Sequence, residues 1–131
     1  MSVKISEYSG KRRDAQNRLA FQWYRDISEQ MADNTPEFYR AFCKLYFGVG
    51  ILKAHDDEFR GKYDEIIRPL PYEKKMALML PPIEIPVTSR LNIKQMSQYL
   101  ETLNKYWLEK GVTLNTMDDL FFEAIGRKKG I

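Results

Sequence analysis

Cationic and amide side chains cluster in one short stretch near the start of the chain. Between Lys11 and Arg25 there are five basic residues and one acid, a local charge of +4 in a chain whose total is +3. Gln16, Asn17 and Phe21 lie in the same stretch. Arg and Lys bind phosphate, amides hydrogen-bond base edges, and aromatic rings stack on unpaired bases. The combination predicts a contact with nucleic acid.

The spacing of these residues indicates a helix with two different faces. Lys11, Arg18 and Arg25 are seven residues apart and return to nearly the same side of a helix. The opposite side carries the apolar residues Leu19, Ala20, Trp23, Tyr24, Ile27 and Met31. One face can pack while the other displays guanidinium groups. A solvated basic face with no partner is the alternative interpretation.

A second polar group stands before a predicted helix start at Asn92. Thr88, Ser89 and Arg90 offer hydroxyl and guanidinium donors, with Lys94 in the first turn, and such donors beside a helix N-terminus can cradle phosphate. The alternative is that the hydroxyls only fix the proline-rich turn. The full set of predicted DNA-contacting residues is Lys11, Arg12, Arg13, Gln16, Asn17, Arg18, Phe21, Arg25, Thr88, Ser89, Arg90, Lys94, Arg127, Lys128 and Lys129.

Catalytic and metal-binding patterns are sparse. The single histidine, His55, precedes Asp56, Asp57 and Glu58, which could form a metal site but are explained better by the favourable position of acids at a helix start. No phosphate-binding loop, dinucleotide fingerprint or nucleophile elbow occurs in the sequence. The single cysteine, Cys43, excludes an internal disulfide and fits a core position. We therefore expect no enzyme activity, no metal and no cofactor.

The elements that position these residues are predicted to be mainly α with a minor β element, in a single domain of about five helices over residues 1–131, with a basic tail at 126–131. A short strand is expected at Val3–Ile5 and an extended segment at Ile83–Val87. Helices are expected at residues 11–31, from Thr35 to a stop at Gly48–Val49–Gly50, at 56–67, around Met76–Met79, from Asn92 to Gly111, and from Thr116.

The helix after Asn92 has the clearest pattern. Asn92 and Gln95 have the spacing of a capping box. The residues Ile93, Met96, Leu100, Leu103 and Trp107 follow at intervals of three and four and predict a buried seam, facing either another helix of the chain or a second copy. The sequence contains no apolar run of membrane-spanning length and no signal-peptide pattern, so we expect a cytoplasmic protein with no membrane partner.

The pattern Arg12-x-x-x-Gln16-Asn17-Arg18-x-x-Phe21 resembles the R-S-x-x-Q-N-R-x-x-aromatic signature of the NinB (Orf) recombination proteins of lambdoid phages. The resemblance spans roughly residues 12–115. It also covers Phe38 to Gly48, the segment Pro86 to Leu91, and the helix from Asn92 with its exit at Gly111–Val112. Prophage-encoded YbcN-type variants are the most similar, through Glu37-x-Tyr39-Arg40, Phe47-Gly48-Val49 and Arg68 to Glu73. Arg13 and Asp14 depart from the usual S-x pair, and the longer N-terminal strand region of the lambda protein is lacking.

Members of that family are non-enzymatic recombination mediators that form homodimers, bind single-stranded DNA and are thought to help load a recombinase onto strands covered by single-strand-binding protein. The resemblance implies that Gln16 and Arg90 lie along the DNA path. It leads us to expect a phage or prophage recombination accessory in a bacterial host, with base flipping or distorted-DNA binding as a variant. The single-strand-binding protein and the recombinase are candidate partners. The alternatives are a metal-dependent nuclease or junction-processing enzyme using Asp56, Asp57 and Glu58, and an adaptor for an acidic protein tail.

Overall fold

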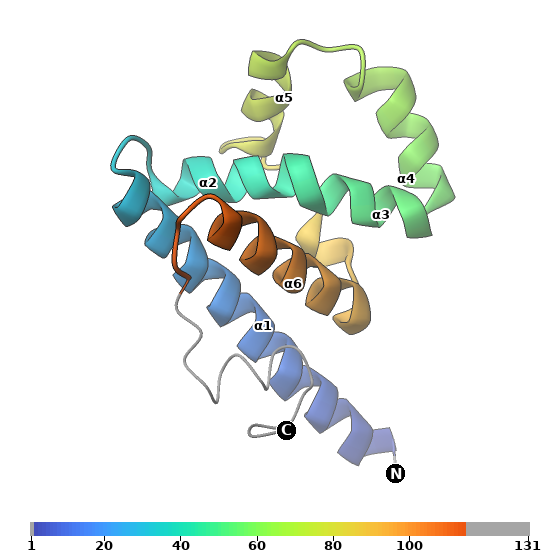
Figure 1. Ribbon diagram of the computed structural model, residues 1–131. Coiled ribbons are helices and arrows are strands. Elements are labelled where there is room, and N and C mark those ends of the chain that lie inside the picture. The colour runs from blue at the N-terminus through green and yellow to red at the C-terminus, as the bar shows by residue number, and fades with distance from the viewer. Residues whose placement is uncertain (1, 115–131) are drawn as a thin grey trace.

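The computed structural model describes residues 2–114, with side chains from residue 12 onward. Its elements, in chain order, are α1 (Ser2–Met31), α2 (Pro36–Cys43), the π-helical turn η1 (Lys44–Gly48), α3 (Val49–His55), α4 (Asp57–Lys62), the π-helical turn η2 (Tyr63–Ile67), α5 (Tyr72–Met79), the 3₁₀ turn η3 (Thr88–Arg90) and α6 (Ile93–Glu109). Because α2, η1 and α3 follow one another without a break, they form one continuous rod (Figure 1). The mainly α prediction is confirmed.

The rod lies between two groups of helices. Helices α1 and α6 pack together on one side of it, and α4 and α5 lie on the other (Figure 1). One hydrophobic core joins α1, the rod and α6, and its most deeply buried side chains include Leu19, Trp23, Ile27, Leu100 and Leu103. This arrangement fixes the angle between α1 and the rod, where the polar residues of interest meet.

Helix α1 has the two-faced character that its sequence predicts. Its inward side, from Leu19 to Ile27, is buried, whereas Met31 at its end is 42% exposed. The opposite side carries the exposed residues Asp14, Arg18 and Arg25. Among residues 2–114, neither this helix of 30 residues nor any other is apolar enough over sufficient length to cross a membrane.

The predicted helix ends are confirmed where side-chain chemistry defines them. Thr35 Oγ1 accepts a hydrogen bond from the Phe38 amide at 3.1 Å, with Pro36 at the first helical position. Asn92 and Gln95 form the reciprocal capping box, with bonds of 2.8 and 2.9 Å. Gly111 follows α6 with a φ of 85°, which glycine adopts without steric cost.

The seam of α6 is buried inside this chain. Met96, Leu100, Leu103 and Trp107 are at most 4% exposed, and Ile93 is partly buried. Helix α6 packs on α1 and on the rod. The seam therefore has its partner within the fold and provides no surface for a second copy.

The minor β element is wrong for residues 2–114, where no strand occurs. Val3 and Ile5 lie in the first turns of α1, because a helix extends at low cost once it has formed. Residues 84–86 form an irregular loop, in which the amide of Glu84 bonds the Leu80 carbonyl and the amide of Ile85 bonds the Leu78 carbonyl, both at 3.0 Å. The flanking prolines lack the amide donors that a strand pairing requires.

The predicted stop at Gly48–Val49–Gly50 is also wrong. The rod continues through these residues to His55. Gly48 is buried against the loop before η3, where an added Cβ would lie 2.9 Å from Cγ1 of Val87. This glycine serves the close approach of two segments rather than a turn. The helix expected from Thr116 lies outside the described residues.

Candidate nucleic-acid interface

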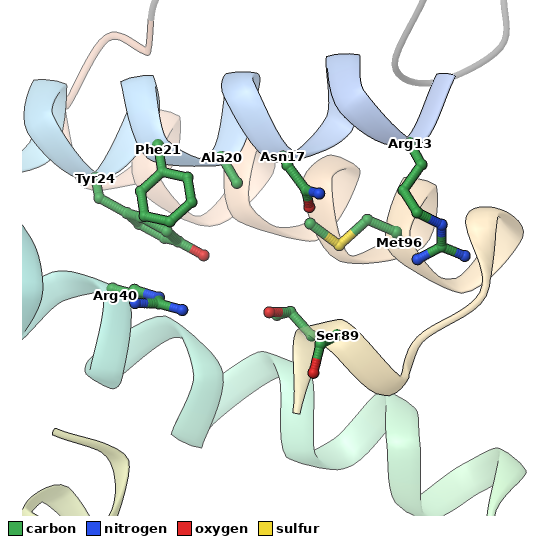
Figure 2. A pocket seen from close by; sticks show the side chains of 9 residues that line it. Arg13, Asn17, Ala20, Phe21, Tyr24, Arg40, Ser89 and Met96 are labelled. Carbon is green, nitrogen blue, oxygen red and sulfur yellow. The ribbon is translucent and has the colours of Figure 1, made fainter. Parts of the chain in front are cut away.

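An open pocket of about 350 Å³ lies between α1, α2 and η3 (Figure 2). We call it the basic pocket, and the residues that line it are Arg13, Asn17, Ala20, Phe21, Tyr24, Arg40, Thr88, Ser89 and Met96. Five of these were predicted as DNA contacts from sequence, three on α1 and two on η3. The fold therefore brings together two candidate segments that are far apart in the chain.

Helical spacing brings the pocket-lining residues of α1 onto one side of that helix. Arg13, Asn17 and Phe21 are four residues apart and form one stripe along the helix, next to the buried apolar face. Figure 2 shows their side chains along one wall of the pocket, with Arg13 at one end and Phe21 toward the other. Arg18 and Arg25 lie further around the helix from this stripe, on the side that faces solvent.

The η3 side is held in place by backbone bonds and by burial. The amide of Arg90 bonds the Val87 carbonyl at 3.0 Å, and the amide of Leu91 bonds the Thr88 carbonyl at 3.1 Å. Val87 and Leu91 are each 1% exposed. Because Gly48 lets the rod approach Val87 closely, the hydroxyl residues Thr88 and Ser89 are carried into the pocket wall.

The floor of the pocket is neutral. Ala20, Tyr24 and Met96 are at most 4% exposed. The hydroxyl of Tyr24 shares a hydrogen bond of 2.8 Å with that of Tyr99, and burial raises the pKa of both phenols, most strongly through loss of water. Both tyrosines therefore stay uncharged, and the charge of the pocket comes from its rim.

Arg40 completes the pocket and was not among the predicted contacts. Its guanidinium lies 5.1 Å from the centre of the Phe21 ring, in a cation–π arrangement, and Nη1 is 3.1 Å from a Glu84 carboxylate oxygen. An arginine within the aromatic run Phe38 to Phe42 was the available signal, because a charge set among aromatic residues needs a partner or a task.

Arg40 has a basic neighbour, Lys44, on the rod as well as its acidic partner Glu84. One turn further along the rod, Lys44 is 3% exposed. Burial, followed by the charge of Arg40, lowers the pKa of Lys44, while the charge of Glu84 raises it. The rod therefore carries two basic residues on successive turns, of which Arg40 lines the pocket.

A neighbouring pocket of about 230 Å³ continues along the groove between α1 and α2. It shares Phe21, Tyr24 and Arg40 with the basic pocket, and its remaining lining residues are Arg25, Pro36 and Glu37. Arg25, another predicted contact, donates to Gln22 Oε1 at 2.9 Å. The pair of Phe21 and Arg40 stands between the two pockets, so a polyanion lying along α1 would meet basic groups on both sides of it.

Two predicted contacts are used inside the fold. Gln16, predicted as a DNA contact and therefore expected at the surface, is instead buried: its side chain is 0% exposed and donates to the Ile93 carbonyl at 2.9 Å and to Ser97 Oγ at 3.1 Å. Arg12 is partly buried and donates to the same Ser97 oxygen at 2.7 Å. These bonds attach α1 to the start of α6 and keep Gln16 away from any ligand at the surface.

The remaining predicted DNA contacts lie either on the surface away from the pocket or outside the described residues. Arg90 is bound at 2.8 Å to Asp56 and lies 5.6 Å from the Phe59 ring, so it faces α4 rather than the pocket lining. Arg18 and Lys94 are exposed. The side chain of Lys11 and the residues Arg127, Lys128 and Lys129 lie outside the described part of the chain.

The acidic group near His55 has local structural tasks. Asp56 caps α4 by accepting from the Phe59 amide at 2.9 Å, and Asp57 pairs with Arg60 on the surface at 2.9 Å. Within the described residues, no group of three or more His, Cys, Asp or Glu side chains is close enough to hold a metal ion. Cys43 is 0% exposed, as predicted for a core residue, and burial raises its pKa to about 12.

Comparison of the chain with protein-family models, with curated proteins and with solved structures gives no match.

Proposed function

We propose that this chain binds single-stranded DNA through the exposed side of α1 and the basic pocket, and acts as a phage or prophage recombination accessory. The observation that carries the proposal is the convergence of Arg13, Asn17, Phe21, Thr88 and Ser89, with Arg40 added, on one open pocket. Guanidinium, amide, hydroxyl and aromatic groups are the set that proteins use toward phosphates and unpaired bases.

The division of roles follows from exposure. Arg18 and Arg25 are exposed beside the pocket and would neutralise phosphates of a strand that lies along α1. Phe21 is 48% exposed and offers a ring for stacking, which the Arg40 guanidinium already covers in part. The side-chain amide of Asn17, at the pocket wall, can both donate and accept hydrogen bonds. A nucleotide turned out of a strand could enter the same space, which keeps distorted-DNA binding within the proposal.

The test is a salt titration of binding to a single-stranded oligonucleotide. If about five phosphates are neutralised, log K should fall with log salt at a slope near −3.5, and Arg18→Gln should flatten that slope by about 0.7. Lys62→Gln, an exposed change on α4, is the matched control and should leave the slope unchanged. A slope near zero contradicts the proposal. Parallel assays of DNA cleavage with Mg²⁺, and of competition by an acidic peptide, test the nuclease and the adaptor alternatives.

We further propose that two copies associate through an aromatic surface on the rod and α5. Tyr46 and Tyr72 are 53% and 43% exposed and their rings are 6.4 Å apart, while Phe42 lies 4.5 Å from Tyr46. Exposed aromatic groups of this kind are enriched at protein interfaces. Sedimentation at micromolar concentration should show a dimer that Tyr46→Lys converts to a folded monomer. A monomeric wild-type chain contradicts this part of the proposal and leaves the DNA interface intact.

A further inference from the structure

Among the described residues, Arg40 is the one basic residue that lines both pockets along α1, and it already holds an acid. Its guanidinium faces α1 across the groove and lies 5.1 Å from the centre of the Phe21 ring (Figure 2). Its Nη1 is 3.1 Å from a carboxylate oxygen of Glu84. A strand that passes along the groove therefore meets, at the point where the two pockets join, an arginine whose charge is partly neutralised.

The pair of Arg40 and Glu84 is exposed and easily replaced. The two side chains are 36% and 40% exposed, so water and salt screen their attraction. The contact engages Nη1, whereas the guanidinium carries five N–H donors and holds phosphate best through two parallel bonds. A phosphate that forms two such bonds can take the place of this carboxylate.

The backbone at Glu84 has an unfavourable conformation that keeps the carboxylate near Arg40. Its φ is 43°, in the left-handed region that residues with a Cβ atom seldom adopt. Two backbone bonds of 3.0 Å hold the loop there, from the amide of Glu84 to the Leu80 carbonyl and from the amide of Ile85 to the Leu78 carbonyl. Residues held in such conformations are concentrated at functional sites, where the surrounding structure maintains them. The loop thus fixes an acid beside the groove at a conformational cost.

Glu84 also acts on Lys44, the buried residue one turn beyond Arg40 on the rod. Burial, and then the charge of Arg40, lower the pKa of Lys44, whereas the charge of Glu84 raises it. The carboxylate therefore offsets the repulsion between two cations when no ligand is present. A phosphate bound to Arg40 brings a negative charge to the same side chain. The carboxylate can then leave without exposing the two cations to each other.

We propose that Glu84 is an autoinhibitory contact of the DNA-binding groove, whose carboxylate occupies Arg40 in the free protein in place of a strand phosphate and is released when DNA binds there. This inference rests on the proposed binding of single-stranded DNA. A strand that also reaches Arg18 and Arg25 gains contacts that offset the release, whereas a small anion such as inorganic phosphate does not. The contact therefore favours a polyanion over small anions.

The experiment repeats the salt titration with the full chain carrying Glu84→Gln. Affinity for the oligonucleotide should rise about two- to fivefold, the range expected for removal of one exposed ion pair. The slope of log K against log salt should become steeper by about 0.7, because Arg40 gains a phosphate contact. In an Arg40→Gln background, Glu84→Gln should change neither affinity nor slope.

Asp14→Asn is the matched control for a diffuse effect of charge. Asp14 is an exposed acid on α1, so its removal should act by the same factor whether or not Arg40 is present, and should leave the slope unchanged. Urea unfolding should show that Glu84→Gln keeps the midpoint of the wild type, which separates the effect from a change in folding. If Arg40→Gln does not fold, the steeper slope of Glu84→Gln, set against that of Asp14→Asn, decides the question.

Each outcome decides between the claims. Wild-type affinity and slope in Glu84→Gln overturn the autoinhibitory contact while the proposed DNA-binding function stands. The same holds for a gain that persists unchanged in the Arg40→Gln background, since the carboxylate would then act without this arginine. Binding by Glu84→Gln where the wild type binds weakly or not at all supports both claims. If neither protein binds any oligonucleotide, the proposed function and this inference fail together.

Discussion

Gln16 and Asn17 are adjacent amides on α1 that should respond to substitution in opposite ways. The Gln16 side chain is fully buried and donates two hydrogen bonds to the start of α6, whereas Asn17 is exposed at the basic pocket. Gln16→Ala should therefore destabilise the fold and leave DNA affinity intact in the folded protein. Asn17→Ala should weaken DNA binding and leave stability nearly unchanged.

The magnitude for Gln16→Ala follows from its contacts. Two intramolecular hydrogen bonds contribute about 0.5–1.5 kcal/mol each, and the buried space left by the side chain adds a further cost, for a total of about 2–4 kcal/mol. An exposed change such as Asn17→Ala should stay within about 0.5 kcal/mol of the wild type. Ser97→Ala removes the acceptor shared by Gln16 and Arg12, and should reproduce part of the loss.

Urea unfolding measures the difference directly. Trp23 and Trp107 are buried and give a fluorescence signal that reports exposure of the core. With a urea m-value of about 1–3 kcal/mol per molar, Gln16→Ala should lower the midpoint by about 1 M or more at unchanged m. DNA binding by the two variants is then compared in the absence of urea, where both are folded. A Gln16→Ala protein with wild-type stability and weakened DNA binding would refute the assignment of this side chain to the fold.

Three further predictions concern the floor of the site and the packing behind it. Gly48→Ala should cost about 1–3 kcal/mol in urea unfolding because its Cβ would lie 2.9 Å from Val87, and an unchanged midpoint would show that the loop yields freely. Tyr24→Phe should cost about 1–3 kcal/mol by leaving the Tyr99 hydroxyl unpaired, whereas the double change to Phe should recover most of the loss, and additive costs would contradict a shared bond. Burial keeps the Cys43 thiol, with a pKa of about 12, protonated at pH 8, so a thiol reagent should modify it only on unfolding, and rapid modification of the native protein would show an accessible thiolate.

Features set by local chemistry were predictable from the sequence. The caps at Thr35 and Asn92 and the exit at Gly111 depend on side chains within a few residues of the helix end, and each is found as predicted. Gly48 is the opposite case, since glycine fits both a helix stop and a close contact. Only the position of Val87, which is distant in sequence, decides between the two.

The kinds of residue at the candidate site were predictable from the sequence, but the particular residues that line it were not. The α1 stripe and the η3 hydroxyls were identified separately, because each is a local pattern. Gln16 and Asn17 differ by one step around the helix, and packing of α6 against α1 determines which of them is buried. Arg40 pairs with the distant Glu84, and its role follows only from the crossing of the rod with α1, which sets its guanidinium over Phe21.

Each wall of the basic pocket is fixed by contacts that lie outside the pocket. Helix α1 is attached to α6 through Gln16, and η3 is held on one side by Val87 against Gly48 and on the other by the pair of Arg90 and Asp56. Since these contacts are made before any ligand arrives, the pocket is formed in the free protein and little of the binding free energy is used to order it. Substitutions on its rim should therefore change affinity without changing stability, and substitutions behind its walls should do the reverse. This separation makes the pocket testable one residue at a time.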